Sequence, residues 1–147
     1  MDSYLVQPDK KSHSVPFGLK KMRLKKNVEA TLKTWNKEYK KGFFSYIILL
    51  LLKDRALYGI EINNKLLEIT DSKVTFQESG TYHILKKLEE SGFIKGTWQK
   101  SKKGPQRKYY SITESGEQLL KVFTENYILP INTAVNNLLS KHFPNLC

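Results

Sequence analysis

Cysteine is almost absent from this sequence. It occurs once in 147 residues, as Cys147. One cysteine cannot form a disulfide within the chain and cannot supply a cysteine-based metal cage. We therefore predict a protein of the reducing cytosol that holds no metal and no other cofactor. Cys147 is expected to have no role, and the alternative is an oxidative bridge between two chains.

Long apolar runs are also missing. The longest, residues 43–52, is interrupted only by Ser45. It has about half of the roughly 20 residues that a membrane-spanning helix needs. The first three residues lack the cationic start of a secretory signal. The sequence thus predicts a cytoplasmic protein with no membrane partner.

The usual signatures of catalysis are not found. The three histidines, His13, His83 and His142, lie far apart in the sequence. There is no glycine-rich phosphate loop, and no nucleophile stands beside an evident base. We predict that the protein is not an enzyme. The alternative is that groups distant in the sequence converge in the fold.

Acidic residues are outnumbered by basic ones. The sequence has 14 Asp and Glu against 25 Lys and Arg, a net charge of +11 with a pI near 9.6. The first 41 residues hold 11 of the basic residues and 4 of the acidic ones. Such a surplus favours a polyanionic partner, which is DNA, RNA or an anionic membrane face. The length predicts one domain with an arm.

Residues 79–90 predict a helix with two different faces. At 100° per residue, Thr81, Ile84, Leu85 and Leu88 fall on an apolar arc that would pack on a core. Groups on the opposite arc can reach phosphates and base edges in a major groove. These groups belong to Ser79, Tyr82, His83, Lys86, Lys87 and Glu90. Gly92 is placed to end the helix.

A basic β-hairpin is predicted to follow. Residues 93–98 and 108–112 suit strands, and Gly104 and Pro105 suit the turn between them. The tip carries five cations and no acid: Lys100, Lys102, Lys103, Arg107 and Lys108. Helix and tip together would grip a duplex at two points. The alternative is an ordinary solvated hairpin tip.

The chain before this unit divides into three parts. Residues 1–18 predict a flexible arm. Residues 19–41 predict a basic helix, and Trp35 belongs to its apolar face. This face would pack on the body or on a partner subunit, and its lysines would bind phosphate or only keep the chain soluble. A third alternative is that the helix lies on a membrane. Residues 42–113 predict the DNA-binding domain, beginning with a buried helix over residues 43–54 and a second helix over residues 58–69.

Residues 114–147 predict a long final helix. Thr113 suits the N-cap position, and Pro130 is expected to kink the helix. Apolar positions recur at spacings of three and four, at Leu120, Phe123, Tyr127, Ile131, Val135 and Leu138. Little of the chain remains to cover them, so we predict a homodimer to which Trp35 also contributes. The alternative is packing on the N-terminal helix of the same chain.

The order of these elements is helix, helix, helix, strand, basic tip, strand, long helix. It predicts a mainly α fold with a small β-hairpin, which is a winged helix-turn-helix. Three segments also resemble the PadR-like transcription regulators: residues 48–62, 79–94 and 104–116. The resemblance covers residues 43–120. It implies a homodimer that binds double-stranded DNA at an inverted repeat in a promoter and usually represses transcription.

The resemblance also implies roles for single residues. It assigns Tyr82, Lys86 and Lys87 to the recognition helix, and Arg107 and Lys108 to the hairpin, or wing. Where the family commonly has Gly-Thr-Leu-Tyr-Pro, residues 79–83 read Ser-Gly-Thr-Tyr-His. The recognised DNA sequence is therefore expected to differ.

The long basic extension is unusual for the family. It resembles that of a cyanobacterial circadian clock modifier, which implies a clock gene as the target. Two other functions remain as alternatives. One is a winged-helix module that binds an acidic protein. The other is an effector-responsive repressor in which Trp35 or Trp98 binds a small planar aromatic molecule.

Overall fold

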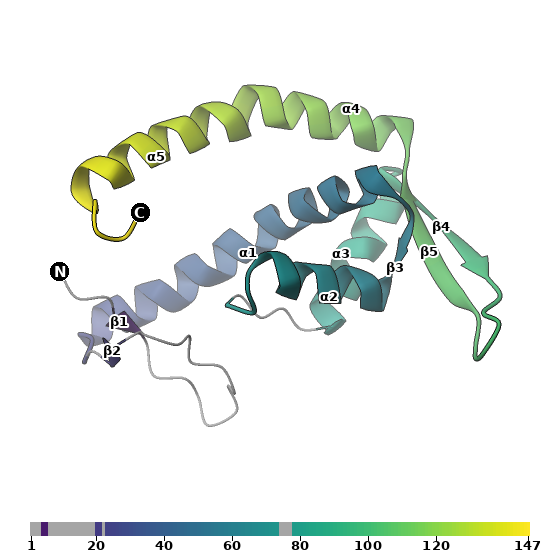
Figure 1. Cartoon of the computed structure of the whole chain (residues 1–147), viewed down its shortest axis with the longest axis horizontal. Coiled ribbons are helices and arrows are strands. Elements are labelled where there is room, and N and C mark those ends of the chain that lie inside the picture. The colour runs from purple at the N-terminus through teal and green to yellow at the C-terminus, as the bar shows by residue number, and fades with distance from the viewer. Residues whose placement is uncertain (1–3, 6–19, 22, 74–77) are drawn as a thin grey trace.

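The computed structural model describes residues 4–5, 20–21, 23–73 and 78–147 (Figure 1). Its main elements confirm the expected mainly α fold with a small β-hairpin. They are α1 (Lys26–Asp54), β3 (Leu57–Tyr58), α2 (Gly59–Ile69), α3 (Glu78–Glu90), β4 (Ile94–Gln99), β5 (Arg107–Ile112), α4 (Glu114–Phe123), η1 (Thr124–Ile128) and α5 (Leu129–His142).

The first helix is longer than the sequence indicated. The expected boundary at residue 42 lies inside α1, which runs unbroken through Gly42. Glycine disfavours a helix by about 1 kcal/mol, but the aromatic face continues across it. The rings of Tyr39 and Phe43 stack with their centroids 5.0 Å apart. The helix also begins at Lys26, later than residue 19. The first half of α1 is mostly exposed and the second half is the centre of the core.

Part of the predicted flexible arm is ordered. Tyr4–Leu5 forms strand β1, which pairs in parallel with β2 (Lys20–Lys21). The remainder of the predicted arm, residues 1–3 and 6–18, lies outside the described residues.

The hairpin belongs to a sheet of three strands rather than two, in the order β3-β5-β4. The third strand is β3, which the sequence did not predict and which pairs antiparallel with β5. Leu57 is fully buried, and the Tyr58 ring meets the Tyr109 ring edge-on at 5.4 Å. Two residues are too few to show an alternating pattern, so the pairing is decided by these tertiary contacts.

The core lies between α1, α2, α3, the sheet and α4. Its buried members are Phe44, Tyr46, Ile48, Leu49, Leu52, Leu57, Ile62, Leu66, Leu85, Leu88, Ile94, Tyr110 and Leu120. Thr81 is also buried, and its hydroxyl bonds to the Asn63 side chain. This bond joins α2 to α3 and satisfies a polar group inside the core. None of the helices among the described residues has both the length and the apolar character needed to cross a bilayer.

The start of α4 confirms the predicted cap. The Thr113 hydroxyl accepts from the Gly116 N–H at 3.1 Å and donates to the Gly92 carbonyl at 2.7 Å. Gly92 has φ +79°, the left-handed conformation expected just after a helix. Gly116 is buried, and a side chain there would collide with the Phe93 backbone. The cap therefore fixes α4 to the turn that follows α3.

The predicted final helix is interrupted near Pro130, where a π-helical segment separates α4 from α5. The five-residue π-helical segment η1 ends two residues before this proline, and α5 then continues with Pro130 in its first turn. Proline has no N–H for the regular helical ladder, and a π segment absorbs such a break. Tyr46 of α1 holds η1 in place through a 2.6 Å hydroxyl–hydroxyl hydrogen bond to Thr124.

Candidate nucleic-acid interface

Helix α3 presents the polar face that the sequence indicated. Leu85 and Leu88 are buried, whereas Tyr82, His83, Lys86, Lys87 and Glu90 are exposed. Tyr82 is 64% exposed, so its ring and hydroxyl are open to a partner. Ser79 is in the first turn of α3, but its side chain lies outside the described residues.

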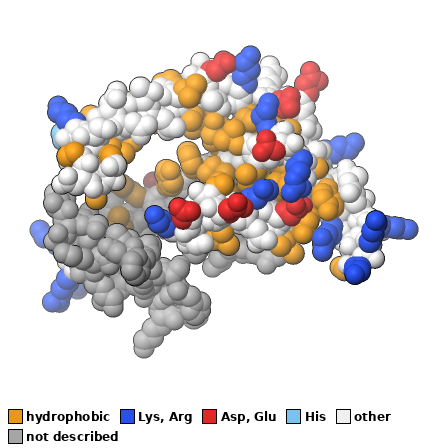
Figure 2. Space-filling view, viewed as in Figure 1, with side chains coloured by type: hydrophobic (Ala, Val, Ile, Leu, Met, Phe, Trp, Pro, Cys, Tyr) orange, Lys and Arg blue, Asp and Glu red, His pale blue; other side chains and the backbone are white. Residues whose placement is uncertain are grey.

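The wing, which comprises β4, β5 and the tip between them, projects from the body (Figure 1). Figure 2 shows Lys and Arg side chains gathered at this end of the molecule. The exposed cations of the tip are Lys100, Lys102, Lys103 and Arg107. Gly104 has φ +125°, which a residue with a side chain rarely adopts, so the tight turn requires glycine there.

Lys108 differs from the other wing cations, because its charge is engaged within the chain. Its ammonium donates to the Glu89 carboxylate of α3 at 2.8 Å. This hydrogen bond raises the pKa of Lys108 above its ordinary value of 10.5. The same ammonium lies 5.5 Å from the centre of the Tyr110 ring. Lys108 is therefore only half exposed at the base of the wing, where the sequence had placed it among the free cations of the tip.

Arg107 is held by an aromatic ring. Its guanidinium carbon lies 4.6 Å from the centre of the Tyr58 ring, a cation–π contact. Tyr58 in turn packs edge-on against Tyr109. Among the described residues no carboxylate pairs with Arg107, so its donors are free for an anionic partner. The role of Tyr58 cannot be read from the sequence, because a tyrosine before a helix gives no sign of the distant arginine beside it.

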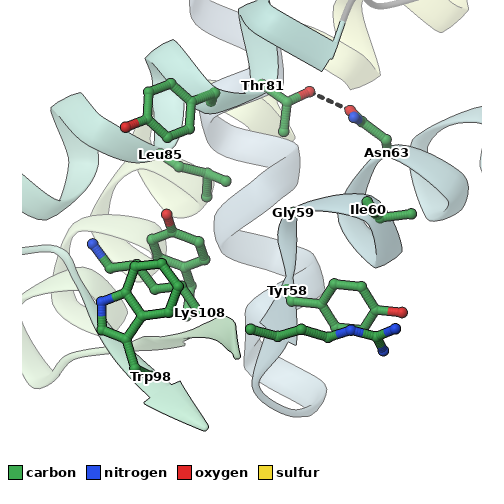
Figure 3. Close-up of a pocket in the computed structure, with 11 residues that line it drawn as sticks. Tyr58, Gly59, Ile60, Asn63, Thr81, Leu85, Trp98 and Lys108 are labelled. Atoms are coloured by element: carbon green, nitrogen blue, oxygen red, sulfur yellow. Dashed lines mark hydrogen bonds between the residues drawn. The ribbon is translucent and has the colours of Figure 1, made fainter. Parts of the chain in front are cut away.

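Tyr82 and Arg107 lie on the same side of the molecule. They line one cavity of about 300 Å³ between α3, the start of α2 and the wing (Figure 3). Leu85, Trp98 and Tyr110 also belong to its lining. Helix α3 and the wing thus open onto one side of the molecule. From the sequence, Trp98 was a candidate only for binding an aromatic effector, since the neighbours of a strand residue are set by folding.

The proposed dimer residues fall into two groups. Leu120 is 3% exposed and belongs to the core of its own chain, which corrects its assignment to the partner-facing set. The others are exposed and form what we call the seam: Trp35, Phe123, Tyr127, Ile131, Val135 and Leu138. Figure 2 shows apolar side chains around the opening between α1 and the α4–α5 arm. Among the described residues no group of His, Cys, Asp and Glu is arranged to hold a metal ion.

Comparison with known proteins places this architecture among transcription regulators. The sequence model of one protein family, the transcriptional regulator PadR-like family, matches residues 48–122 of this chain. A PadR-like transcriptional regulator from Bacillus cereus is 33% identical, with a TM-score of 0.60 over 69% of this chain and 96% of that one. A transcriptional regulator from Clostridium thermocellum is 30% identical, with a TM-score of 0.59 over 68% and 96%.

Two further relatives extend the comparison. Bacillus subtilis PadR, whose structure is solved in complex with operator DNA, is 32% identical, with a TM-score of 0.50 over 54% of this chain and 45% of that one. An uncharacterized protein X from Lysinibacillus sphaericus is 28% identical over 87 residues, which are 59% of this chain and 80% of the relative.

Proposed function

The chain belongs to the PadR-like family of transcriptional regulators, and from this we propose that it is a cytoplasmic homodimeric repressor that binds an inverted repeat in a promoter. The observation that carries the proposal is the shared cavity of Tyr82 and Arg107. Because the helix and the wing face one side, both can contact the same segment of duplex. The DNA-bound Bacillus subtilis relative supports DNA as the partner.

Helix α3 enters the major groove with its exposed polar face. Tyr82 and His83 lie near its first turn and contact base edges, and Lys86 and Lys87 contact phosphates. The wing tip reaches the flanking backbone or the adjacent minor groove. The residues we assign to DNA are Ser79, Tyr82, His83, Lys86, Lys87, Lys100, Lys102, Lys103 and Arg107, with Lys108 supporting the base of the wing.

The seam joins two copies of the chain. Every residue of α5 is exposed, including its apolar Ile131, Val135 and Leu138. A row of aromatic rings continues the apolar surface from α1 to η1: Tyr46 packs on Phe123 at 5.4 Å, and Phe123 stacks on Tyr127 at 5.4 Å. Apolar surface of this extent is typical of an interface. A two-fold dimer places its two α3 helices on one face of the DNA, which requires an inverted repeat.

The regulated gene is inferred only from the N-terminal extension. The basic extension before residue 42 resembles that of the cyanobacterial circadian clock modifier Pex, so we propose a circadian clock gene as the target. The basic first half of α1, with its exposed lysines, supports added attraction to DNA phosphates.

Sequencing the genomic DNA that copurifies with the protein tests the proposal. We expect one inverted repeat to be enriched, and a reporter placed behind it to be repressed. The enriched duplex should outcompete mixed-sequence DNA by at least about 10³-fold. Recovery of DNA without any enriched sequence would contradict a sequence-specific repressor. Absence of copurifying DNA would favour the alternative of a winged-helix module that binds an acidic protein.

A further inference from the structure

The cavity between α3 and the wing has an apolar character that DNA binding by lysines alone does not explain. Two large side chains at its lining are exposed although they are apolar, Trp98 at 63% and Ile60 at 54%. Neither belongs to the seam, and both lie on the side of the molecule that carries Tyr82 and Arg107. Exposed apolar side chains gathered in a concave site mark a binding surface.

The charge of the cavity restricts what it can bind. Its lining includes Arg107 and Lys108 but no Asp or Glu. Asn63 and Thr81, also in the lining, are bonded to each other. Among the described residues, Arg107 is therefore the charged group of the lining without a carboxylate partner, since Lys108 already binds Glu89. An occupant that fits has one anionic group and an apolar portion beside it.

The position of the cavity identifies the occupant. It lies between the helix that would enter a major groove and the wing that would reach the adjacent minor groove. In a duplex, one sugar–phosphate strand separates two adjacent grooves. A deoxyribose has an apolar C–H face, and the phosphate attached to it carries the charge. We propose that the cavity seats one nucleotide of this strand, with the deoxyribose against Trp98 and Ile60 and its phosphate directed to Arg107.

This inference rests on the proposed function and adds to it. It makes Trp98 and Ile60 residues that contact DNA, although neither side chain carries a charge. The contact is to the backbone and not to a base, so it is the same for every DNA sequence. A duplex of mixed sequence at low salt is therefore a sufficient probe.

The two tryptophans can be followed separately by fluorescence. Trp98 lines the cavity and is 63% exposed, whereas Trp35 belongs to the seam, away from the cavity. The Trp35→Phe variant reports only Trp98, and the Trp98→Phe variant reports only Trp35. On addition of a mixed-sequence duplex of about two helical turns, the acrylamide quenching constant of Trp98 should fall about twofold or more, because the sugar covers the indole. That of Trp35, which the partner chain covers in the seam, should change less than that of Trp98.

Binding measurements provide a second readout. Trp98→Ala should weaken binding to the same duplex about five- to tenfold, while Trp98→Phe retains most of the affinity. Since indole carries no charge, the slope of log affinity against log salt should stay the same. The slope should fall by about one unit for Arg107→Ala. This difference separates an apolar contact to sugar from a general loss of charge or of folding.

Helix α2 supplies a matched truncation. Ile60 and Ile69 are 54% and 55% exposed at opposite ends of α2, and only Ile60 lines the cavity. Ile60→Ala should weaken binding about threefold, because the variant loses part of one apolar contact. Ile69→Ala should leave it unchanged.

The outcomes distinguish the inference from the function on which it rests. If the unmodified protein shows no salt-dependent binding to duplex DNA, the proposed function fails. If it binds, but Trp98 stays as accessible to acrylamide as before and Ile60→Ala behaves like Ile69→Ala, the cavity does not seat the backbone. Protection of Trp98 together with an unchanged salt slope in Trp98→Ala supports the inference.

Discussion

Lys108 of the wing donates a hydrogen bond to Glu89 of helix α3, with 2.8 Å between Nζ and Oε1. The other carboxylate oxygen of Glu89 accepts from the Gly96 N–H, also at 2.8 Å. A side chain on residue 96 would displace the ends of the Glu89 and Lys108 side chains, so glycine leaves room for this pair. One carboxylate thus joins α3, β4 and β5 and fixes the angle between the helix and the wing.

Glu89→Gln should destabilise the fold by up to about 1 kcal/mol at neutral pH, because the pair is partly exposed. Glutamine still offers an oxygen to Gly96, so the change reports the charge. The pKa of Lys108 is raised by this bond above 10.5, so the stabilisation is complete below pH 10.5 and is lost as the pH rises through the raised pKa. Urea unfolding of both proteins across this range measures the difference. The exposed neighbour substitution Glu90→Gln is the control, and a gap that persists at alkaline pH would contradict the assignment.

Arg107→Ala should weaken binding to the recognised DNA by about 1–3 kcal/mol. The guanidinium is held by Tyr58 and has no carboxylate partner among the described residues. The substitution therefore removes a cation that is already oriented for a DNA phosphate or base. Fluorescence anisotropy with a labelled duplex measures the loss. Arg107→Lys keeps the charge and should recover only part of it. Unchanged affinity at moderate salt would remove the wing from the interface.

Tyr82→Ala should reduce the preference for the recognised sequence over mixed DNA. The side chain is exposed and makes no contribution to the core, so its loss should leave the fold intact while removing a base contact that is worth about 1–3 kcal/mol. Competition between the two duplexes gives the ratio directly. Tyr82→Phe separates the hydroxyl from the ring. If the ratio is the same in all three proteins, Tyr82 does not read bases.

Leu138→Lys should convert the dimer to monomers. Leu138 is exposed on α5, and a charge buried in an apolar interface costs several kcal/mol unless it is paired. Analytical ultracentrifugation distinguishes the two states. Asn136→Lys adds the same charge at an exposed polar position of the same helix and should remain dimeric. A dimer that survives Leu138→Lys would place the interface elsewhere.

Leu120→Ala and Leu119→Ala should differ strongly in thermal unfolding. Leu120 is 3% exposed and Leu119 is 38% exposed, although the two are adjacent in α4. Truncating a buried leucine destabilises a protein by about 2–5 kcal/mol, and the exposed one should lose well under about 1 kcal/mol. If instead Leu120→Ala weakened only self-association, Leu120 would belong to the interface after all.

Much of the winged unit was predictable because its signals are local. Helix α3 shows two arcs at helical spacing, the wing has its Gly-Pro turn, and Thr113 caps α4 as its residue type indicates. The continuous α1 was not predictable from Gly42, since aromatic packing across it outweighs a small helix penalty. Strand β3 was missed because a two-residue strand has no period to detect.

The sequence by itself determined the winged architecture and the excess of positive charge, because periodicity, capping and turn formation depend on neighbours within a few residues. The tertiary structure alone decided which side chains are free to act. It engaged Lys108 with Glu89, buried Leu120 in the core, and brought Trp98, Ile60 and Arg107 to one cavity. These relationships join residues distant along the chain, and only the packing of α2, α3 and the wing against one another sets the distances between them.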